Sequence, residues 1–234
     1  MKNINPIAIV GASGKMGQEI YQILQDQKIP HFGISRNGNA ENYSKVYTFK
    51  TAPLSKASGM IDFSLPEAFN EALQSAIENK VPLVSGTTGL SARQLNDMKT
   101  ASKKIPILWS PNMSIGIAVL KKAIQHFSAL NNFDFQIEEL HHNKKKDAPS
   151  GTGISLQEIL QKISTQKLPP IISIRAGGLI GTHKVHAVSN EEHLIFEHTA
   201  INRRVFASGA IRAHYWLKNK KNGLYSIEDT IHAP

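Results

Sequence analysis

The stretch that decides the fold of this chain runs Ile7-Ala8-Ile9-Val10-Gly11-Ala12-Ser13-Gly14-Lys15-Met16-Gly17. Its four leading apolar residues predict a buried strand, and residues 18–27 continue beyond the last glycine as an amphipathic helix. A glycine turn between a strand and a helix is the context in which glycines indicate a dinucleotide site. The pattern G-x-x-G-x-x-G differs by one residue from the commonest fingerprint, and the alternative is a glycine-rich turn in an unrelated α/β protein.

Each glycine of this motif has its own predicted role. Gly11 permits the tight turn, Gly14 allows the backbone to approach a pyrophosphate closely, and Gly17 lets the helix pack against the strand. We therefore predict a dinucleotide-binding site, which consists of Gly11, Ala12, Ser13, Gly14, Lys15 and Met16.

The rest of the first half alternates predicted strands and helices, as in a doubly wound sheet. Strands are expected at residues 31–35, 59–63, 81–85 and 105–110, and helices at residues 66–79 and after Ser91. In open parallel sheets, ligands bind beyond the carboxyl ends of the strands. The residues at those ends are candidates for the ribose and nicotinamide side of a cofactor, although any one of them alone is also explained as a simple turn. They are Phe63, Gly86, Thr87, Thr88, Ser110, Pro111, Asn112 and Met113.

The tip of the second strand, Gly33-Ile34-Ser35-Arg36-Asn37-Gly38, predicts which cofactor is preferred. An acid at this place binds the ribose 2′-hydroxyl of NAD, whereas an arginine accommodates the 2′-phosphate of NADP. No carboxylate stands here, since the nearest acid is Glu41. Ser35 and Arg36 suit a phosphate, and Lys15 adds charge. We expect NADPH to be preferred and NADH to remain usable; the alternative is a solvated Arg36 and an indifferent enzyme.

The second half of the chain has a different pattern. Its predicted strands follow one another with little helix between them, which favours a mixed or antiparallel sheet. The strands are expected at residues 133–140, 171–175, 181–188, 193–199, 204–206 and 223–227, and the helices at residues 115–130, 153–167 and 207–216.

One run in this half carries the chemistry: Glu139-Leu140-His141-His142-Asn143-Lys144-Lys145-Lys146-Asp147-Ala148-Pro149-Ser150-Gly151-Thr152. Ser150 is a natural N-cap for the helix that follows, and a capped helix start offers unpaired N–H groups to a carboxylate or phosphate. Lysines add full charges, and a histidine exchanges a proton near neutral pH. The run describes a site for a small anionic substrate that needs protonating. The alternative is a solvated basic loop.

Composition narrows the classes of function. The 234 residues are 41% hydrophobic and 19% charged, which is ordinary for a globular protein. The absence of cysteine excludes disulfides, thiolate zinc sites and a cysteine nucleophile. The net charge of +9 is spread along the chain, so we expect anionic metabolites rather than nucleic acid. No apolar run approaches the roughly 20 residues that span a bilayer, so we expect no membrane partner and a cytoplasmic location.

The histidines outside the run do not predict a metal site. His183 and His186 are three apart on a predicted strand and therefore face opposite sides of it. We expect no structural or catalytic metal.

Taken together, the motifs resemble those of the 4-hydroxy-tetrahydrodipicolinate reductase (dihydrodipicolinate reductase) family almost from end to end. The His-His-x-x-Lys-x-Asp-x-Pro-Ser-Gly-Thr run is the most specific match. The other matching segments are Val10 to Gly17, Ile61 to Ser64 with Pro66 to Ala68, Gly86 to Gly89, Pro111 to Ser114, Arg175 to Gly177, Phe206-Ala207 with Gly209-Ala210, and Gly223 to Ser226. Between Gly33 and Gly59 the chain is short for the family.

The resemblance implies an α/β enzyme of two domains. A Rossmann-type parallel-sheet domain, residues 1–112 completed by residues 207–234, would bind the dinucleotide. An α+β domain, residues 113–206, would bind substrate and form a homotetramer, with an interface expected in residues 171–206. The implied reaction is NAD(P)H-dependent reduction of a cyclic dicarboxylate in diaminopimelate and lysine biosynthesis.

The resemblance also implies roles for individual residues. His141 is the expected proton donor and Lys145 the second catalytic group. His142, Ser150, Gly151 and Thr152 are expected to hold a substrate carboxylate, while a structural role is the alternative for His142.

Two rival classes of function are also open to sequence reasoning. One is another Rossmann oxidoreductase, such as a semialdehyde dehydrogenase, which would need the thiol nucleophile that this chain lacks. The other is a non-catalytic dinucleotide sensor, which would have no use for a general acid beside a capped helix.

Overall fold

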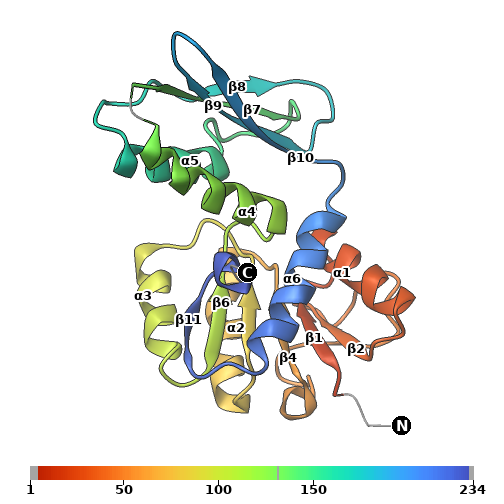
Figure 1. The fold of residues 1–234 in the computed structure, drawn as a ribbon. Helices are drawn as coiled ribbons and strands as arrows, with labels where there is room; N and C mark the ends of the chain where they lie inside the picture. The colour runs from red at the N-terminus through yellow and green to blue at the C-terminus, as the bar shows by residue number, and fades with distance from the viewer. Residues whose placement is uncertain (1–4, 131, 232–234) are drawn as a thin grey trace. The chain divides into compact units, whose positions relative to one another are not determined.

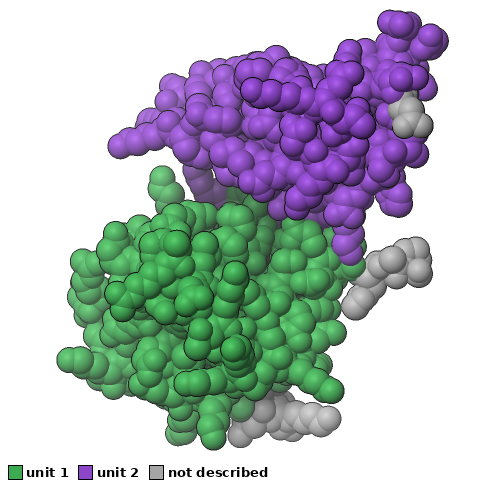
Figure 2. Space-filling model, turned by 90° about the vertical axis from the view of Figure 1, so that its left-hand side faces the viewer, with its two compact units in different colours: residues 1–113, 206–234 green, residues 114–205 purple. Residues whose placement is uncertain are grey.

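The computed structural model describes residues 5–130 and 132–231. The chain divides into two compact units, which Figure 2 colours green and purple. Unit 1 consists of residues 1–113 and 206–234, and unit 2 of residues 114–205. Unit 1 is therefore formed by both ends of the chain, and unit 2 is inserted between them.

Unit 1 contains a seven-stranded sheet in the order β11-β6-β5-β4-β1-β2-β3, in which every neighbouring pair is parallel (Figure 1). The strand order reverses between β1 and β4, and in such sheets ligands bind outside the carboxyl ends of the strands at that point. The strands are β1 (Ile7–Val10), β2 (His31–Ile34), β3 (Val46–Tyr47), β4 (Gly59–Asp62), β5 (Leu83–Ser85), β6 (Pro106–Trp109) and β11 (Gly223–Tyr225).

Helices cover both faces of this sheet. Alternate residues of β1 point to opposite faces, and the residues on both faces are buried. Ala8 and Val10 pack with residues of the helices α2 and α3, for example Phe69 and Met98, in one apolar cluster. Ile9 points to the other face and is also fully buried. The helices are α1 (Lys15–Asp26), α2 (Pro66–Asn79), α3 (Ala92–Ala101) and α6 (Arg204–Leu217), with short 3₁₀ turns at Leu54–Lys56 and Ile227–Thr230.

Unit 2 contains a four-stranded mixed sheet in the order β10-β9-β7-β8. β7 pairs in parallel with β8 and antiparallel with β9, which pairs antiparallel with β10. The elements are α4 (Ile115–Ile124), a 3₁₀ helix (Gln125–Ala129), β7 (Asp134–His141), α5 (Gly151–Ile163), β8 (Ile172–Arg175), β9 (Gly181–Val188) and β10 (His193–Ala200). Alternate residues of β7 face the helices, so Phe135 and Ile137 form one apolar cluster with Leu156 and Leu160 of α5.

The fold class expected from the sequence is confirmed, while three local predictions were wrong. Residues 204–206 are not a strand but the first turn of α6, and Asn202 Oδ1 accepts a hydrogen bond from the N–H of Arg204, the first residue of this helix. The helix expected at 153–167 begins at Gly151 and ends at Ile163. The helix expected at 115–130 changes to 3₁₀ geometry at Gln125. In the described part of the chain, no helix is long and apolar enough to cross a membrane.

Candidate active site

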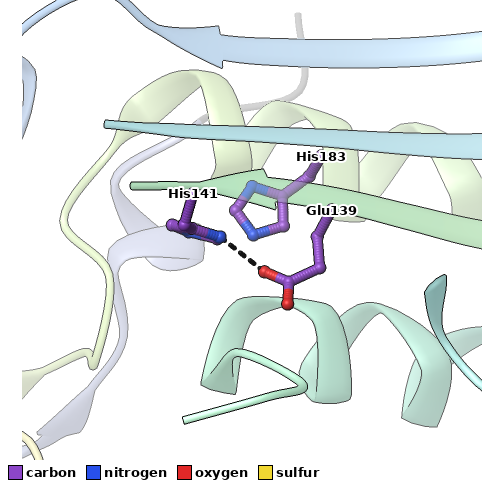
Figure 3. A group of neighbouring side chains, drawn as sticks. All are labelled: Glu139, His141 and His183. Carbon is purple, nitrogen blue, oxygen red and sulfur yellow. Dashed lines mark ion pairs between the residues drawn. The ribbon is translucent and has the colours of Figure 1, made fainter. Parts of the chain in front are cut away.

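Three polar side chains are buried at one end of the inner face of the unit 2 sheet. Strand alternation places Glu139 and His141 of β7 on the same face as Ile137, and the register of β9 brings His183 opposite Glu139. Glu139 is 0% exposed, His183 4% and His141 7%. Figure 3 shows the Glu139 carboxylate directed towards His141, with the His183 ring beside them.

Glu139 is held in its ionised form. Its Oε1 accepts hydrogen bonds from Arg175 Nη2 at 2.6 Å and Ser173 Oγ at 2.7 Å, and from the Ser150 N–H at 3.2 Å. Its Oε2 lies 2.6 Å from His141 Nδ1, in a close electrostatic contact rather than an aligned hydrogen bond. Burial favours the neutral acid, but the hydrogen bonds and the nearby charge outweigh it and lower the pKa of Glu139 to about 2.

The two ring nitrogens of His141 have different surroundings. Nδ1 faces Glu139, whereas Nε2 faces Gly181, where a Cβ atom would lie 3.0 Å from it. The glycine therefore keeps a side chain away from Nε2. Burial lowers the pKa of His141 from 6.5, Glu139 opposes that shift, and Lys145 adds to it. A carboxylate at Nδ1 orients the ring and leaves Nε2 to exchange a proton.

Lys145 lies in the loop that joins β7 to α5. Its Nζ is 2.8 Å from Asp147 Oδ1, and burial, which favours the neutral acid, is outweighed by Lys145, so that the pKa of Asp147 is lowered. The backbone carbonyl of Asp147 accepts a hydrogen bond of 2.7 Å from Arg175 Nη2. Lys145 is half-buried, while Lys144 and Lys146 are exposed. The structure thus singles out Lys145 from the three lysines.

The start of α5 is capped by a buried serine. Ser150 Oγ accepts a hydrogen bond from the Gly153 N–H at 3.1 Å, as the sequence predicts for an N-cap, and lies 3.2 Å from His183 Nε2. Burial and the neighbouring His141 lower the pKa of His183 to about 3, so this imidazole is neutral near pH 7. Gly151 is exposed and has no atom within 4 Å of its Cβ position. The helix start is therefore open at Gly151.

The remaining residues predicted to bind substrate lie around this helix start. Thr152 is half-buried in the first turn of α5. His142 is half-buried directly after β7, and its Nδ1 is a buried atom with no hydrogen-bond partner in the described part of the chain. His141, His142, Lys145, Ser150, Gly151 and Thr152 all belong to unit 2.

In unit 1, the predicted cofactor residues at three strand ends pack against one another. Gly11 has a φ of +80°, and a Cβ there would lie 2.7 Å from the carbonyl oxygen of Phe63. A Cβ at Gly86 would lie 2.3 Å from the Phe63 ring. Trp109 Nε1 donates to the Thr87 carbonyl at 3.0 Å. The carboxyl ends of β1, β4, β5 and β6 are therefore joined by direct contacts.

Side-chain hydrogen bonds hold these strand ends in place. The buried Asp62 accepts from Ser85 Oγ and Thr87 Oγ1, both at 2.8 Å. Ser110 Oγ donates to the Asn112 carbonyl at 2.7 Å. Thr87, Ser110 and Met113 are buried, whereas Thr88 and Pro111 are exposed and Asn112 is half-buried. The buried members can offer a ligand little more than backbone atoms.

The start of α1 is more open than that of α5. Its N-cap, Gly14, makes no side-chain cap, and Ser13, Gly14 and Lys15 are exposed. Ala12 is buried and Met16 half-buried. A Cβ at Gly17 would lie 2.4 Å from the Gly11 carbonyl oxygen, which agrees with the predicted packing of helix on strand.

At the tip of β2, the two predicted phosphate-binding residues differ in burial: Ser35 is buried and Arg36 is exposed. Ser35 is buried, and its Oγ donates to the Asn39 carbonyl at 2.8 Å and accepts from the Asn39 N–H at 2.9 Å. Its hydrogen-bonding groups are thus used within the turn. Arg36 is exposed, and no hydrogen bond or ion pair of its side chain occurs among the described residues.

Glu139, His141 and His183 each offer a ligand atom, and these atoms lie within 4.8 Å of one another. The set nevertheless fits a metal poorly. Two ligands of a tetrahedral zinc ion are about 3.3 Å apart if each bond is about 2.0–2.1 Å, whereas Glu139 Oε2 and His141 Nδ1 are separated by 2.6 Å. The other oxygen of Glu139 is occupied by the Arg175 guanidinium. The arrangement suits a proton-carrying imidazole better than a cation.

Comparison with known proteins shows the family of this chain over nearly its whole length. The family model described as "Dihydrodipicolinate reductase, N-terminus" matches residues 5–113, and the model described as "Dihydrodipicolinate reductase, C-terminus" matches residues 116–231. The chain belongs to the dihydrodipicolinate reductase family. It is accordingly an NAD(P)H-dependent oxidoreductase, as the sequence motifs indicated.

Relatives in this family cover nearly the full length of the chain. The 4-hydroxy-tetrahydrodipicolinate reductase of Bdellovibrio bacteriovorus is 47% identical over 234 residues, covering 99% of this chain and 97% of its own. The enzyme of the same name from Sulfurimonas denitrificans is 36% identical over 250 residues, covering 96% and 98%. A dipicolinate-bound dihydrodipicolinate reductase from Paenisporosarcina sp. TG-14 shares the fold, with a TM-score of 0.81 at 22% identity over 97% of this chain and 100% of that chain.

Sequence reasoning missed three residues that the structure places around His141. It gave no role to Glu139, Arg175 or His183, although Glu139 opens the run that ends at Thr152 and Arg175 lies in a segment that matches the family. One signal was available, because Glu139 and His141 are two apart on a predicted strand and must share a face. The contribution of β8 and β9 depends on strand register, which no local pattern in the sequence reveals.

Proposed function

We propose that this chain reduces 4-hydroxy-tetrahydrodipicolinate to tetrahydrodipicolinate with NADPH or NADH, as a step of diaminopimelate and lysine biosynthesis in the cytoplasm. The observation that carries the proposal is the place of His141 in unit 2. Its Nδ1 faces a buried carboxylate, its Nε2 faces a glycine, and a serine-capped helix start follows within ten residues. This arrangement can bind a small anion and protonate it.

The protonation step belongs to His141. Loss of the substrate's 4-hydroxyl group as water gives a conjugated imine. When bound, NADPH would supply a hydride to one carbon of that imine, and the adjacent carbon must then gain a proton. His141 Nε2 gives up that proton, and Glu139 stabilises the imidazolium before the transfer. Burial lowers the pKa of His141 and so favours its neutral form in the free protein. A bound dianion would favour its charged form.

The substrate carboxylate is assigned to the start of α5. The first N–H groups of a helix have no intrahelical partner, and at Gly151 the backbone is exposed with no side chain in the way. Ser150 and Thr152 flank that position, and the half-buried His142 precedes the loop. Lys145 supplies positive charge to the electron-rich intermediate.

The dinucleotide is assigned to unit 1. The residues fit such a ligand, because the exposed run from Ser13 to Lys15 leaves the start of α1 open and a Cβ at Gly14 would meet only the Gly11 carbonyl, at 3.2 Å. The residues proposed to bind it are Gly11, Ala12, Ser13, Gly14, Lys15, Met16, Arg36, Phe63, Gly86, Thr87, Thr88, Ser110, Pro111, Asn112 and Met113. The exposed guanidinium of Arg36 supports a preference for NADPH over NADH.

We further propose a homotetramer assembled through the outer face of the unit 2 sheet. That face carries the exposed Ile172, Ile174 and Ile195, beside the ion pair of Lys184 with Glu138. Apolar side chains gathered on one sheet face are typical of subunit interfaces, and closed assemblies favour self-complementary surfaces. A tetramer is expected by light scattering at micromolar concentration, and a monomer there would contradict the proposal.

Imine reduction by the purified protein tests the proposed reaction. NADPH absorbance should fall when 4-hydroxy-tetrahydrodipicolinate is generated in the cuvette, with one NADPH consumed for each tetrahydrodipicolinate formed. NADPH that binds but is never consumed would indicate a dinucleotide sensor. Consumption with an aldehyde substrate in place of the imine would indicate another class of oxidoreductase.

A further inference from the structure

The Arg175 side chain hydrogen-bonds both to the carboxylate of Glu139, which faces His141, and to the loop that carries Lys145. We propose that Arg175 is a positioning residue that couples these two catalytic groups. It acts through Glu139 on His141, and through the backbone of Asp147 on Lys145. The proposal rests on the roles given to His141 and Lys145 in the proposed function.

Strand register brings Arg175 to this place. β8 pairs in parallel with β7 so that Arg175 lies beside His141 at the ends of both strands, and the Ala176 N–H donates to the His141 carbonyl at 2.9 Å. Ser173 and Arg175 are on the inner face of β8, where both bond to Glu139. The guanidinium therefore reaches the site from a strand rather than from a mobile loop.

One nitrogen of Arg175 makes both contacts. Nη2 donates to Glu139 Oε1 at 2.6 Å and to the Asp147 carbonyl at 2.7 Å, while Nη1 donates to the carbonyl of Ile174 at 2.9 Å. The planar guanidinium fixes the directions of these donors relative to one another. A lysine ammonium has a single nitrogen on a flexible stem and cannot reproduce the arrangement.

Each contact continues to a catalytic group. Glu139 Oε2 lies 2.6 Å from His141 Nδ1, and Asp147 Oδ1 lies 2.8 Å from Lys145 Nζ. The Glu139 side chain is 0% exposed and that of Arg175 17%, so the centre of this chain of contacts is shielded from water. A displacement of the guanidinium would shift the imidazole and the ammonium together.

A purely structural role is the competing explanation, because a buried carboxylate needs a partner whether or not it serves catalysis. The pH dependence of the rate separates the two. The charged or titratable groups that face His141 are Glu139 on β7, Arg175 on β8, His183 on β9, and Lys145 and Asp147 in the loop. A general acid works below its pKa, so kcat falls as the pH rises through the pKa of His141.

Two of these groups, Glu139 and Arg175, shift the pKa of His141 in opposite directions. Glu139 raises it and Arg175 lowers it. Loss of the guanidinium in Arg175→Ala should therefore move the falling limb of the kcat profile to higher pH, and Glu139→Gln should move it to lower pH. A general loosening of the fold would shift both limbs in one direction or neither.

The experiment measures kcat against pH for wild type, Arg175→Ala, Arg175→Lys and Glu139→Gln, with Arg93→Ala as the control. Arg93 is an exposed arginine of unit 1 whose contact with Asp97 is 4.0 Å long. We expect kcat to fall roughly 10–100-fold in both Arg175 variants, since a misplacement of about 1 Å is worth roughly 10²-fold. The KM for NADPH should stay within about twofold, and guanidinium ion should partly rescue Arg175→Ala.

Arg175→Lys keeps the charge that Glu139 needs, so it tests the proposal even if the alanine variant does not fold. Wild-type kcat in Arg175→Lys, or limbs that move in the same direction in Arg175→Ala and Glu139→Gln, would overturn the proposal. In a Glu139→Gln background, Arg175→Lys should still lower kcat, though by a smaller factor, through the Lys145 branch. If Arg175→Lys causes no further loss of kcat in the Glu139→Gln background, Arg175 does not act on Lys145 through Asp147. An inactive wild-type enzyme would instead refute the proposed function.

Discussion

Two helix starts in this molecule are built for anions, and they differ in what surrounds them. α1 in unit 1 begins at a glycine with no side-chain cap, and its exposed turn has Lys15 as its one ionisable residue. α5 in unit 2 begins at a buried serine, with His141, His183 and Glu139 behind it and Lys145 in the preceding loop. Both offer N–H groups and a partial positive charge.

The difference teaches how binding and chemistry are divided in the proposed function. The start of α1 suits a ligand that is held by its phosphates and not altered there. The start of α5 adds a group that carries a proton, a carboxylate that orients it, and an ammonium that stabilises negative charge. A helix start alone can therefore bind an anion. Catalysis also requires reactive side chains, which the neighbouring strands and loop supply at α5.

The largest expected effect comes from removing the proton donor at α5. His141→Ala should lower kcat by roughly 10²–10⁴-fold, the usual contribution of a general acid. NADPH affinity should be nearly unchanged, because His141 belongs to unit 2 and the dinucleotide is assigned to unit 1. Steady-state kinetics and a fluorescence titration with NADPH measure the two quantities. Near wild-type turnover in the variant would remove His141 from the mechanism.

The second prediction concerns His183, the other imidazole near the start of α5. If His183 is held neutral, His141 is the imidazole that can donate a proton there. Burial lowers the pKa of His183 from 6.5 to about 3. A lowered folded-state pKa adds stability above pH 6.5, and that stability is lost as the pH falls towards the folded value. At one pKa unit per 1.36 kcal/mol, the loss by pH 4 is on the order of 3 kcal/mol.

Urea unfolding of wild type and His183→Gln between pH 7 and pH 4 measures this term. The variant should lose less of its free energy of unfolding over that range than wild type does. Parallel pH profiles for the two proteins would show that His183 is not held neutral, and the start of α5 would then have two candidate proton donors.

The third prediction concerns the packing that holds α1 in place. In Gly17→Ala, the new Cβ would lie 2.4 Å from the Gly11 carbonyl oxygen, so the helix must shift. Overpacking of this kind costs about 1–3 kcal/mol, which should appear in the free energy of unfolding. NADPH binding should weaken as well, while Gly151→Ala, with open space at its Cβ position, serves as a stability control. Equal stability of wild type and Gly17→Ala would show that Gly17 does not set the position of α1.

The smallest expected effect is on the choice of cofactor. Wild type should have a higher kcat/KM with NADPH than with NADH, and Arg36→Ala should lose roughly tenfold with NADPH, about the value of one charge-assisted hydrogen bond, and little with NADH. Comparing kcat/KM for both cofactors in both proteins measures this. A preference for NADH in wild type, or an unchanged NADPH efficiency in the variant, contradicts the role given to Arg36.

The sequence predicted the fold class because its signals are local. The apolar run Ile7–Val10 and the glycines after it determine a strand, a turn and a helix within twenty residues. The same kind of local rule predicted Ser150 as the N-cap of α5, although the helix was expected to begin at Gly153 and begins at Gly151. The start of α6 was missed because Val205 and Phe206 in its first turn also fit a strand.

The surroundings of the proposed proton donor were harder to predict because they depend on contacts distant in sequence. Arg175 reaches Glu139 across 36 residues, and the pairing of β7 with β8 decides that contact. Ser35 also has surroundings that the sequence did not predict. Its type and place suggest a phosphate ligand, but the compact turn after β2 uses its hydroxyl to bond Asn39.

The central claim is that the start of α1 binds the dinucleotide and the start of α5 serves the reaction. One pair of alanine variants tests this claim most directly. Gly14→Ala puts a methyl group where the pyrophosphate is proposed to approach, and it needs only a small local shift, because the Gly11 carbonyl lies 3.2 Å away. Ser150→Ala removes the cap of α5. NADPH affinity and the single-turnover rate of imine reduction at saturating NADPH are measured for both. We predict that Gly14→Ala weakens NADPH binding but keeps the rate, and that Ser150→Ala keeps the binding but lowers the rate. The same response of both variants in either measurement would contradict this account.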